Sequence, residues 1–214
     1  DVVIAHNDKM IIELKRRGCT VPLVSLDIFD YFTERERKED RDKKMDGVCF
    51  AGNLNPKKTH FLYALDESEI QINLNVYGKK EADFKRLNYC GCYEPELLPE
   101  KMEGEYGLIW EGDDFCYIES DNPYIMYNNP HKASLYIVSC LPIIIWEKAA
   151  IADYIVSRGI GITIGSLDEL PERLSSISSE EYRKLMSNIR KERKELITGK
   201  HIHRAISSAE KYLL

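Results

Sequence analysis

Basic side chains that could bind a phosphate stand in two separate loops of this sequence. The first loop, residues 128–132, reads Asn-Asn-Pro-His-Lys and leads into a helical pattern, which puts Lys132 in the first turn of that helix. Pro130 suits a first turn because its missing N–H costs nothing there, and Asn128 or Asn129 could cap the free backbone amides. An anion would be stabilised at this point by the lysine and the helix dipole together. A capped helix with a solvated lysine fits the same pattern.

The second loop, residues 52–59, combines a glycine with two adjacent lysines. Gly52 allows a ligand or another backbone segment to approach closely, and Lys57 and Lys58 place positive charge near the start of a helical pattern. The loop has neither the GxxxxGK(S/T) pattern of a P-loop nor the GxGxxG pattern of a dinucleotide site. A turn with solvated lysines is the alternative interpretation.

Two further loops carry residues suited to a nucleoside or a metal. Residues 77–80 follow one strand pattern, and Trp110 ends another, where its ring could stack on a base. A tryptophan at such a position more often belongs to the core. Asp113 and Asp114 form an acidic pair, but no further acids at a matching spacing support a metal site.

Patterns for nucleophilic catalysis are weak. No GxSxG motif is present, and His131, the best placed histidine, has no evident Asp or Ser partner. His201 and His203 stand two residues apart in a helical pattern, so they point to different faces and solvated side chains are expected.

Short apolar strand patterns alternate with helical patterns along most of the chain. Strands are expected at 2–5, 21–26, 47–51, 70–77, 89–93, 106–110, 143–146 and 161–164. Helices are expected at 9–17, 61–65, 95–102, 149–158, 179–195 and 201–214, after 128–132 and after 166–170, while 82–87 is read as a brief helix or an irregular piece. This alternation predicts an α/β fold with a Rossmann-like, doubly wound parallel sheet. Such sheets bind ligands beyond the carboxyl ends of their strands, where the four loops would lie.

Length, charge and cysteine content limit the classes of protein to which this chain could belong. The 214 residues suffice for one large or two small domains, and 43% hydrophobic with 31% charged residues is ordinary for a globular chain. A formal net charge of −6 argues against a general nucleic-acid binder, which needs a basic surface. The six cysteines form no disulfide framework, and Cys90-Gly-Cys92 has no second pair at zinc-ligand spacing, so a reducing cytoplasm fits best.

No stretch is predicted to span a membrane. The apolar run 137–146 is too short and is interrupted by Pro142, and no signal peptide is recognisable. A cytoplasmic location is expected, with a peripheral position at the inner face of the membrane left open. The chain begins at Asp1 and enters a strand pattern at once, so we expect it to be a fragment of a longer protein.

Several segments form an ordered series of motifs. They are Ile-Ala-His-Asn-Asp-Lys-Met at 4–10, Phe-Ala-Gly-Asn-Leu at 50–54, Tyr-Gly-Leu-Ile-Trp-Glu-Gly-Asp at 106–113 and Asn-Asn-Pro-His-Lys-Ala-Ser-Leu-Tyr at 128–136, extended by 141–146 and 159–161. In this order they resemble a bacterial family of sugar-nucleotide glycosyltransferases of GT-B type. That family includes the glucosyltransferase 3 enzymes and the related β-1,6-galactofuranosyltransferases.

The resemblance implies two Rossmann-like domains with an active site in the cleft between them, of which this chain holds the C-terminal half. Residues 1–32 would be the tail of the N-terminal, acceptor-side domain, and the charged segment 33–45 a linker. Residues 46–197 would form the C-terminal domain that binds a nucleotide sugar, and 198–214 a helix that packs back toward the N-terminal part. Most of the acceptor domain would be absent, so activity of this chain by itself is left open.

Carried over position by position, the resemblance implies a metal-independent site for a UDP-sugar. The phosphate-binding basic residue after the Gly-Asn-Leu turn falls on Lys57 or Lys58, with Lys58 favoured, and Lys132 would hold the diphosphate. Nucleoside contacts would come from loops near three aromatic residues. The predicted donor-binding residues are Gly52, Asn53, Lys57, Lys58, Tyr77, Tyr93, Trp110, Asn128, Asn129 and Lys132. No catalytic residue is assigned, because a catalytic base would lie in the absent domain.

The function implied by the resemblance is transfer of a hexose, glucose or galactofuranose, from a UDP-sugar to a glycan, glycoprotein or lipid-linked acceptor. Basic side chains and helix dipoles would stabilise the departing diphosphate without a bound metal or other cofactor. The alternative is a non-catalytic nucleotide-binding or oligomerisation module of the same fold. A truncated acceptor half would leave an exposed apolar face, which favours a homo-oligomer.

Overall fold

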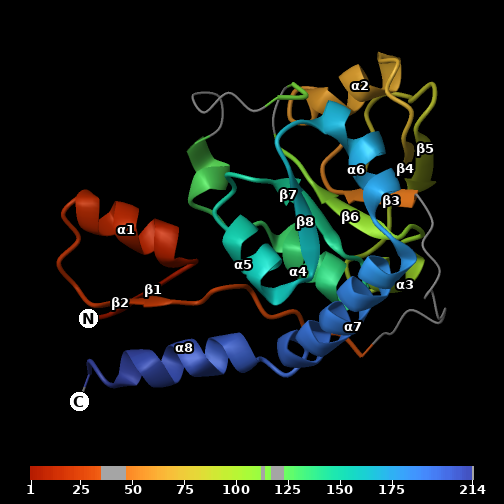
Figure 1. Cartoon of the computed structure of the whole chain (residues 1–214). Coiled ribbons are helices and arrows are strands. Elements are labelled where there is room, and N and C mark those ends of the chain that lie inside the picture. Colours follow the sequence, from red (N-terminus) through yellow and green to blue (C-terminus); the bar gives the residue numbers. More distant parts are fainter. Residues whose placement is uncertain (35–46, 112–113, 117–122, 214) are drawn as a thin grey trace.

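The computed structural model of the chain (Figure 1) describes residues 1–34, 47–111, 114–116 and 123–213. The predicted charged linker, 33–45, lies outside the described residues from residue 35 onward, and so does Asp113 of the acidic pair.

A six-stranded parallel sheet forms the centre of the molecule, as predicted. Its spatial order is β5-β4-β3-β6-β7-β8. The strands are β3 (Gly47–Ala51), β4 (Asn73–Tyr77), β5 (Asn88–Gly91), β6 (Tyr106–Ile109), β7 (Ile143–Trp146) and β8 (Gly161–Ile164). The chain builds outward from β3 through β4 to β5, then returns to the other side of β3 and continues from β6 to β8. This reversal is the topological switch of a doubly wound sheet, and it lies between β3 and β6.

Helices flank this sheet and bury its strands. They are α2 (His60–Glu67), α3 (Leu98–Lys101), α4 (His131–Val138), α5 (Ala152–Arg158), α6 (Leu170–Ser176) and α7 (Ser179–Leu196), with short 3-10 turns at Pro123–Met126 and Leu167–Glu169. Every residue of β3, β6 and β7 is buried, as expected for parallel strands covered on both faces. Apolar side chains of the strands and helices form one continuous core.

A second, smaller unit stands beside the sheet (Figure 1). It is a parallel pair of strands, β1 (Val3–Ala5) and β2 (Leu23–Ser25), joined through α1 (Asp8–Arg16). The last helix, α8 (Lys200–Glu210), contacts both strands, so the two ends of the chain lie in the same part of the molecule. Arg204 of α8 holds this arrangement through an ion pair with Asp27 at 2.5 Å and a hydrogen bond to the carbonyl of Leu26 at 2.8 Å.

Most deviations from the predicted element bounds have local causes. The predicted piece at 82–87 is irregular, because the backbone amides of Lys85, Arg86 and Leu87 all donate to the carboxylate of Asp66 at 2.6 to 2.8 Å. That carboxylate takes donors that a regular helix would use internally. Strand β4 begins at Asn73 rather than at residue 70 because a turn precedes it, in which the amide of Ile70 donates to the Ser68 hydroxyl.

Strands β3 and β6 pair over two residues and then separate. Their register joins Val48 to Tyr106 and Cys49 to Gly107. Beyond that point the hydroxyl of Tyr136 on α4 lies between the strands, where it accepts a hydrogen bond from the amide of Ala51 at 3.0 Å and donates one to the carbonyl of Leu108 at 3.0 Å. A fully buried tyrosine therefore satisfies the backbone groups that the separated strands leave unpaired.

Removing this hydroxyl should destabilise the fold without removing the ring. We expect Tyr136→Phe to lower the free energy of unfolding by about 1–3 kcal/mol, because a buried N–H and C=O lose their partner. Chemical denaturation measures the change. The matched control is Tyr212→Phe, whose side chain is exposed on the last turn of the chain and which should cost no more than about 0.5 kcal/mol. Equal stability of the two variants would contradict this role of Tyr136.

Candidate functional site

The carboxyl ends of β3 and β6 lie side by side at the topological switch, and we call the region just beyond them the crevice. Gly52 follows β3, Trp110 and Glu111 follow β6, and α4 begins beside them at His131. Ligands of doubly wound sheets bind at such a point. The residues around this crevice are therefore the candidates for a binding site.

Lys132 lies at the centre of the crevice. It is the second residue of α4, its side chain is 21% exposed, and its Nζ lies 3.7 Å from a carboxylate oxygen of Glu111. The same Nζ lies 4.6 Å from the centre of the Phe50 ring. Burial lowers the pKa of Lys132, and the negative charge of Glu111 partly offsets that effect. A partly buried cation at a helix start is well placed to bind an anion.

Two glycines make room for this lysine. A Cβ atom on Gly52 would lie 3.0 Å from Cε of Lys132, so the absence of a side chain lets the lysine reach across the end of β3. Gly78, after β4, has a φ of +144°, and a Cβ there would lie 2.0 Å from the carbonyl oxygen of Gly52. The loops that follow β3 and β4 thus pack directly against each other and against Lys132.

The predicted basic pair, Lys57 and Lys58, extends from the loop after β3. Asn55 shapes this turn: its side-chain oxygen accepts from the amide of Lys57 at 2.9 Å and its carbonyl from the amide of Lys58 at 2.8 Å. Both lysines are exposed, and neither forms an ion pair with another described residue. Asn53 is exposed too, with its side-chain oxygen accepting from the amide of Asn55. The geometry gives no reason to prefer Lys58 over Lys57 as the phosphate-binding residue.

Two of the predicted aromatic contacts are corrected by the structure. Tyr77 is buried, and its hydroxyl accepts from the amide of Glu103 and donates to the carbonyl of Lys101. Trp110 is fully buried, and its indole N–H donates to the carbonyl of Asp114 at 3.0 Å. Neither ring has a face open to a nucleoside, since both are part of the core. Tyr93, which follows β5, is 37% exposed and is accessible to a ligand.

The two asparagines before α4 have different roles, and neither caps the helix as predicted. The cap residue of α4 is Pro130, which lies just before the helix and not in its first turn, and no side chain caps the helix. The buried amide of Asn129 donates to the carbonyls of His6 at 2.7 Å and Asp27 at 2.9 Å, and accepts from the side chain of Asn7 at 2.7 Å. Its hydrogen-bonding capacity is thus used by the N-terminal unit and not by a ligand.

Asn128 keeps its side-chain amide available. It is largely buried shortly before α4, and its side chain makes no hydrogen bond within the described ranges 1–34, 47–111, 114–116 and 123–213. Asn128 therefore remains a candidate ligand residue, whereas Asn129 does not.

Four residues at this junction were not among the predicted site residues. Glu111 pairs with Lys132, and Phe29 stacks on His131 with ring centres 4.3 Å apart. His6 and Asn7 reach Asn129 from the N-terminal unit. His6, Asn7 and Glu111 lie in the matching motifs 4–10 and 106–113, but their partners are distant in sequence, and Phe29 lies in none of the motifs.

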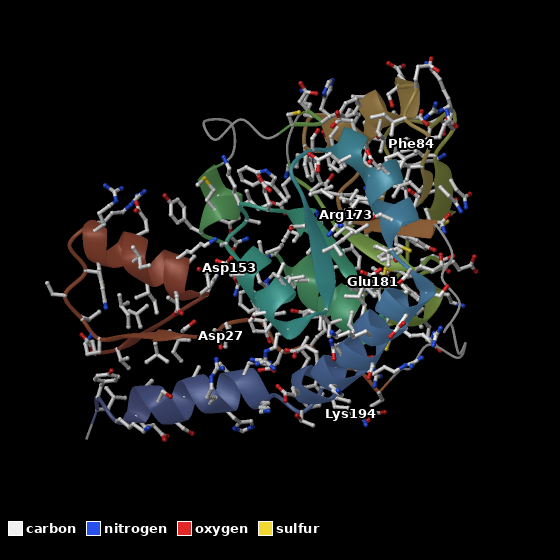
Figure 2. The ribbon with its side chains drawn as sticks, in the orientation of Figure 1. Asp27, Phe84, Asp153, Arg173, Glu181 and Lys194 are labelled. Atoms are coloured by element: carbon white, nitrogen blue, oxygen red, sulfur yellow. The ribbon has the colours of Figure 1, made fainter. Side chains whose placement is uncertain are left out.

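A cleft of about 670 Å³ lies next to this junction, between α1 and the loop that follows β7. Lys9 of α1 crosses one end of it, where its Nζ lies 3.3 Å from the carbonyl of Ala149 and 3.3 Å from the carboxylate of Asp153. Figure 2 shows Asp153 on the side of α5 that is turned toward α1. The cleft is lined by Lys9, Ile12, Glu13, Arg16, Met126, Tyr127, Glu147 and Lys148. It separates the N-terminal unit from the six-stranded sheet.

One cluster of potential metal ligands occurs in the described part of the chain, away from the crevice. It comprises Glu192, Glu195 and His201, whose ligand atoms lie within 4.8 Å of one another. Arg158 already contacts both carboxylates, at 3.1 Å and 3.4 Å. Burial opposes the charge of Glu192, but the nearby His201 ring at 3.5 Å, a hydrogen bond from Tyr154 and the charge of Arg158 outweigh it and lower its pKa. The guanidinium takes the place that a cation would occupy, so this cluster is an ion-pair network.

Among the described residues, no helix is both long and apolar enough to cross a membrane.

The chain matches the family described as "Glucosyltransferase 3-like, C-terminal domain" over residues 48–209. It belongs to this family. The match begins in β3 and ends in α8, so it covers all the strands around the crevice. The resemblance predicted from the motifs is confirmed.

Similar proteins include two bacterial relatives. The chain is 32% identical over 207 residues to "Beta-1,6-galactofuranosyltransferase WbbI" of Escherichia coli strain K12, which is 94% of this chain and 61% of the relative. It is 31% identical over 122 residues to "Glucosyltransferase 3" of Streptococcus gordonii, which is 55% of this chain and 36% of the relative. The chain thus spans less than two thirds of the length of these relatives.

A solved structure, that of the pneumococcal O-GlcNAc transferase GtfA in complex with UDP and GlcNAc, has a similar fold. Its TM-score is 0.53 at 13% identity, covering 100% of this chain and 45% of that chain. At this identity the likeness concerns the fold alone, and it agrees with the predicted C-terminal half of a GT-B arrangement.

The different hydrogen bonds of Asn128 and Asn129 allow a test of how the N-terminal unit is held against the loop before α4. We expect Asn129→Ala to loosen the N-terminal unit by about 1–3 kcal/mol, because the carbonyls of His6 and Asp27 lose a buried donor. Native-state hydrogen exchange should show faster exchange of the β1 and β2 amides, while the β7 amides are little changed. Asn128→Ala is the matched control and should leave both sets within about 0.5 kcal/mol. Uniform acceleration across the sheet in Asn129→Ala would refute a local role at the junction.

Proposed function

We propose that this chain is the donor-binding part of a glycosyltransferase, and that the crevice between β3 and β6 binds the diphosphate of a UDP-sugar. The observation that carries the proposal is the position of Lys132. It lies in the first turn of α4, half-buried, and reaches over Gly52 at the topological switch of the sheet.

The chemistry of glycosyl transfer fits this arrangement. When the bond between the sugar and the diphosphate breaks, negative charge develops on the departing phosphate oxygen. A fixed cation and the amide end of a helix stabilise that charge more strongly in a partly water-excluded site than in bulk water. Lys132 and the start of α4 would supply both, so the proposal requires no bound metal.

The rest of the donor site follows from the same geometry. Asn128 lies shortly before α4 with a free amide, and Tyr93 offers an accessible ring for the nucleoside. Lys57 or Lys58 would approach the phosphates from the loop after β3. Gly52 and Gly78 keep the backbone of two loops close to the ligand.

The names of the similar proteins support a hexose as the transferred group. One relative is called a galactofuranosyltransferase and the other a glucosyltransferase, and the similar solved structure holds UDP. We infer that the donor is UDP-galactofuranose or UDP-glucose, and that the acceptor is a glycan, a glycoprotein or a lipid-linked sugar. The acceptor would approach through the cleft between α1 and the loop that follows β7.

An alternative is a non-catalytic module that associates through its N-terminal unit. Apolar side chains are exposed on α1, in the segment after β2 and beyond the end of α8, namely Ile12 at 66%, Phe32 at 84% and Leu213 at 62%. A second copy of the chain could cover them, as could the remainder of a longer protein. Sedimentation of the chain distinguishes the two: a monomer over the micromolar range that still binds UDP excludes the oligomerisation module.

Replacing Lys132 should weaken UDP binding. We expect Lys132→Ala to cost about 1–3 kcal/mol in isothermal titration calorimetry with UDP, the range for losing a charged hydrogen bond. Lys194→Ala is the control, since Lys194 is exposed on α7 (Figure 2) and should leave the affinity unchanged. Absence of UDP binding by the unmodified chain at millimolar concentration would exclude the proposed function. Equal affinities of the two variants would exclude Lys132 as the diphosphate ligand.

Comparing Lys57→Ala with Lys58→Ala shows which of the two lysines contacts the phosphates of UDP. The residue that contacts the phosphates should lose about 0.5–1 kcal/mol of UDP affinity on replacement, because an exposed charge is screened. We expect this loss in Lys58→Ala and not in Lys57→Ala, with unfolding free energies unchanged in both. The reverse order would move the role to Lys57, and no loss in either would remove this loop from the phosphate site.

A further inference from the structure

Lys132 carries a counter-ion of its own within the crevice. The carboxylate of Glu111 lies 3.7 Å from its Nζ, and both side chains are similarly exposed, at 26% for Glu111 and 21% for Lys132. Glu111 directly follows the buried end of β6, which fixes its backbone at the mouth of the crevice. Any anion that reaches Lys132 therefore comes close to a negative charge as well.

This carboxylate acts against a bound anion. Like charges a few ångströms apart repel each other more strongly in a partly desolvated crevice than in bulk water. The repulsion grows with the charge on the phosphate group nearest to Lys132. Glu111 therefore discriminates between phosphate groups by their charge.

The donor and the product of sugar transfer differ in that charge. In a UDP-sugar the β-phosphate is a diester and carries one negative charge. In UDP it is a terminal phosphate, whose second ionisation lies near pH 6, so that it is mostly doubly charged at neutral pH. A fixed carboxylate next to Lys132 penalises UDP more than it penalises the UDP-sugar.

We propose that Glu111 is a specificity-determining residue that weakens binding of the product UDP relative to the sugar-bearing donor, and so favours product release. This proposal rests on the proposed function of the crevice. Lys132 attracts both ligands, whereas Glu111 causes the difference in their affinities.

The test compares two ligands that differ in charge and carry no transferable hexose. They are UDP and its β-methyl ester, in which the terminal phosphate is a diester with one negative charge. Isothermal titration at pH 8, where the terminal phosphate of UDP is fully ionised, gives both affinities for the unmodified chain and for Glu111→Gln. The amide keeps the size of the side chain and an oxygen that can accept from Lys132, and removes the charge alone.

We expect Glu111→Gln to bind UDP about 3- to 30-fold more tightly and the methyl ester by a clearly smaller factor, because the removed repulsion scales with ligand charge. Glu111→Asp, which retains the charge, should keep the discrimination of the unmodified chain. Glu210→Gln, at the exposed end of α8, controls for a general change in net charge and should alter neither affinity.

Equal gains for both ligands, or no gain for UDP, in Glu111→Gln would overturn this role of Glu111 while leaving the proposed function intact. Absence of binding of either ligand to the unmodified chain would overturn the proposed function, and the role of Glu111 with it. Thermal unfolding of each variant shows whether it is folded at the temperature of the titration.

Discussion

The hydroxyl of Tyr136 sets the geometry on which the rest of the site depends. It replaces the next backbone hydrogen bond between β3 and β6. These strands therefore separate toward their carboxyl ends without leaving the Ala51 amide and the Leu108 carbonyl unpaired. Gly107 on β6 makes this possible, since a Cβ there would lie 2.3 Å from the tyrosine ring. Lys132 stands one helical turn before Tyr136 on α4, on the same face. The helix that parts the strands therefore also delivers the lysine to the opening.

The loop before α4 is held from the opposite side by the N-terminal unit. Asn129 binds two carbonyls and one side chain of that unit, and His131 stacks on Phe29. The start of α4 is thus held in place both by the six-stranded sheet and by the N-terminal unit. The N-terminal unit therefore contacts the segment that leads directly into Lys132.

Local patterns were sufficient to predict the parallel sheet and the place of Lys132 at the start of a helix. Strands β3, β7 and β8 have the predicted bounds. Their sequences are short, continuous apolar runs, which is the pattern of parallel strands buried on both faces. Lys132 was predicted from its neighbours in sequence alone. The role of Asn129 was not, because its partner Asn7 lies 122 residues away, and Glu111 was missed because its pairing with Lys132 depends on the strand order. Trp110 has the sequence context of a ligand contact, but tertiary packing covers its ring.

The most direct test of the central claim is to map UDP onto the backbone by nuclear magnetic resonance. Titration of the isotope-labelled chain should shift the amide signals of Gly52, Gly78, Glu111 and Lys132, which surround the crevice between β3 and β6. The amide of Glu105, at the opposite end of β6, should not move, since it is bound to the carbonyl of Gly47 away from the crevice. Shifts confined to the cleft beside α1, or to the ion-pair network around Glu192, would contradict the account.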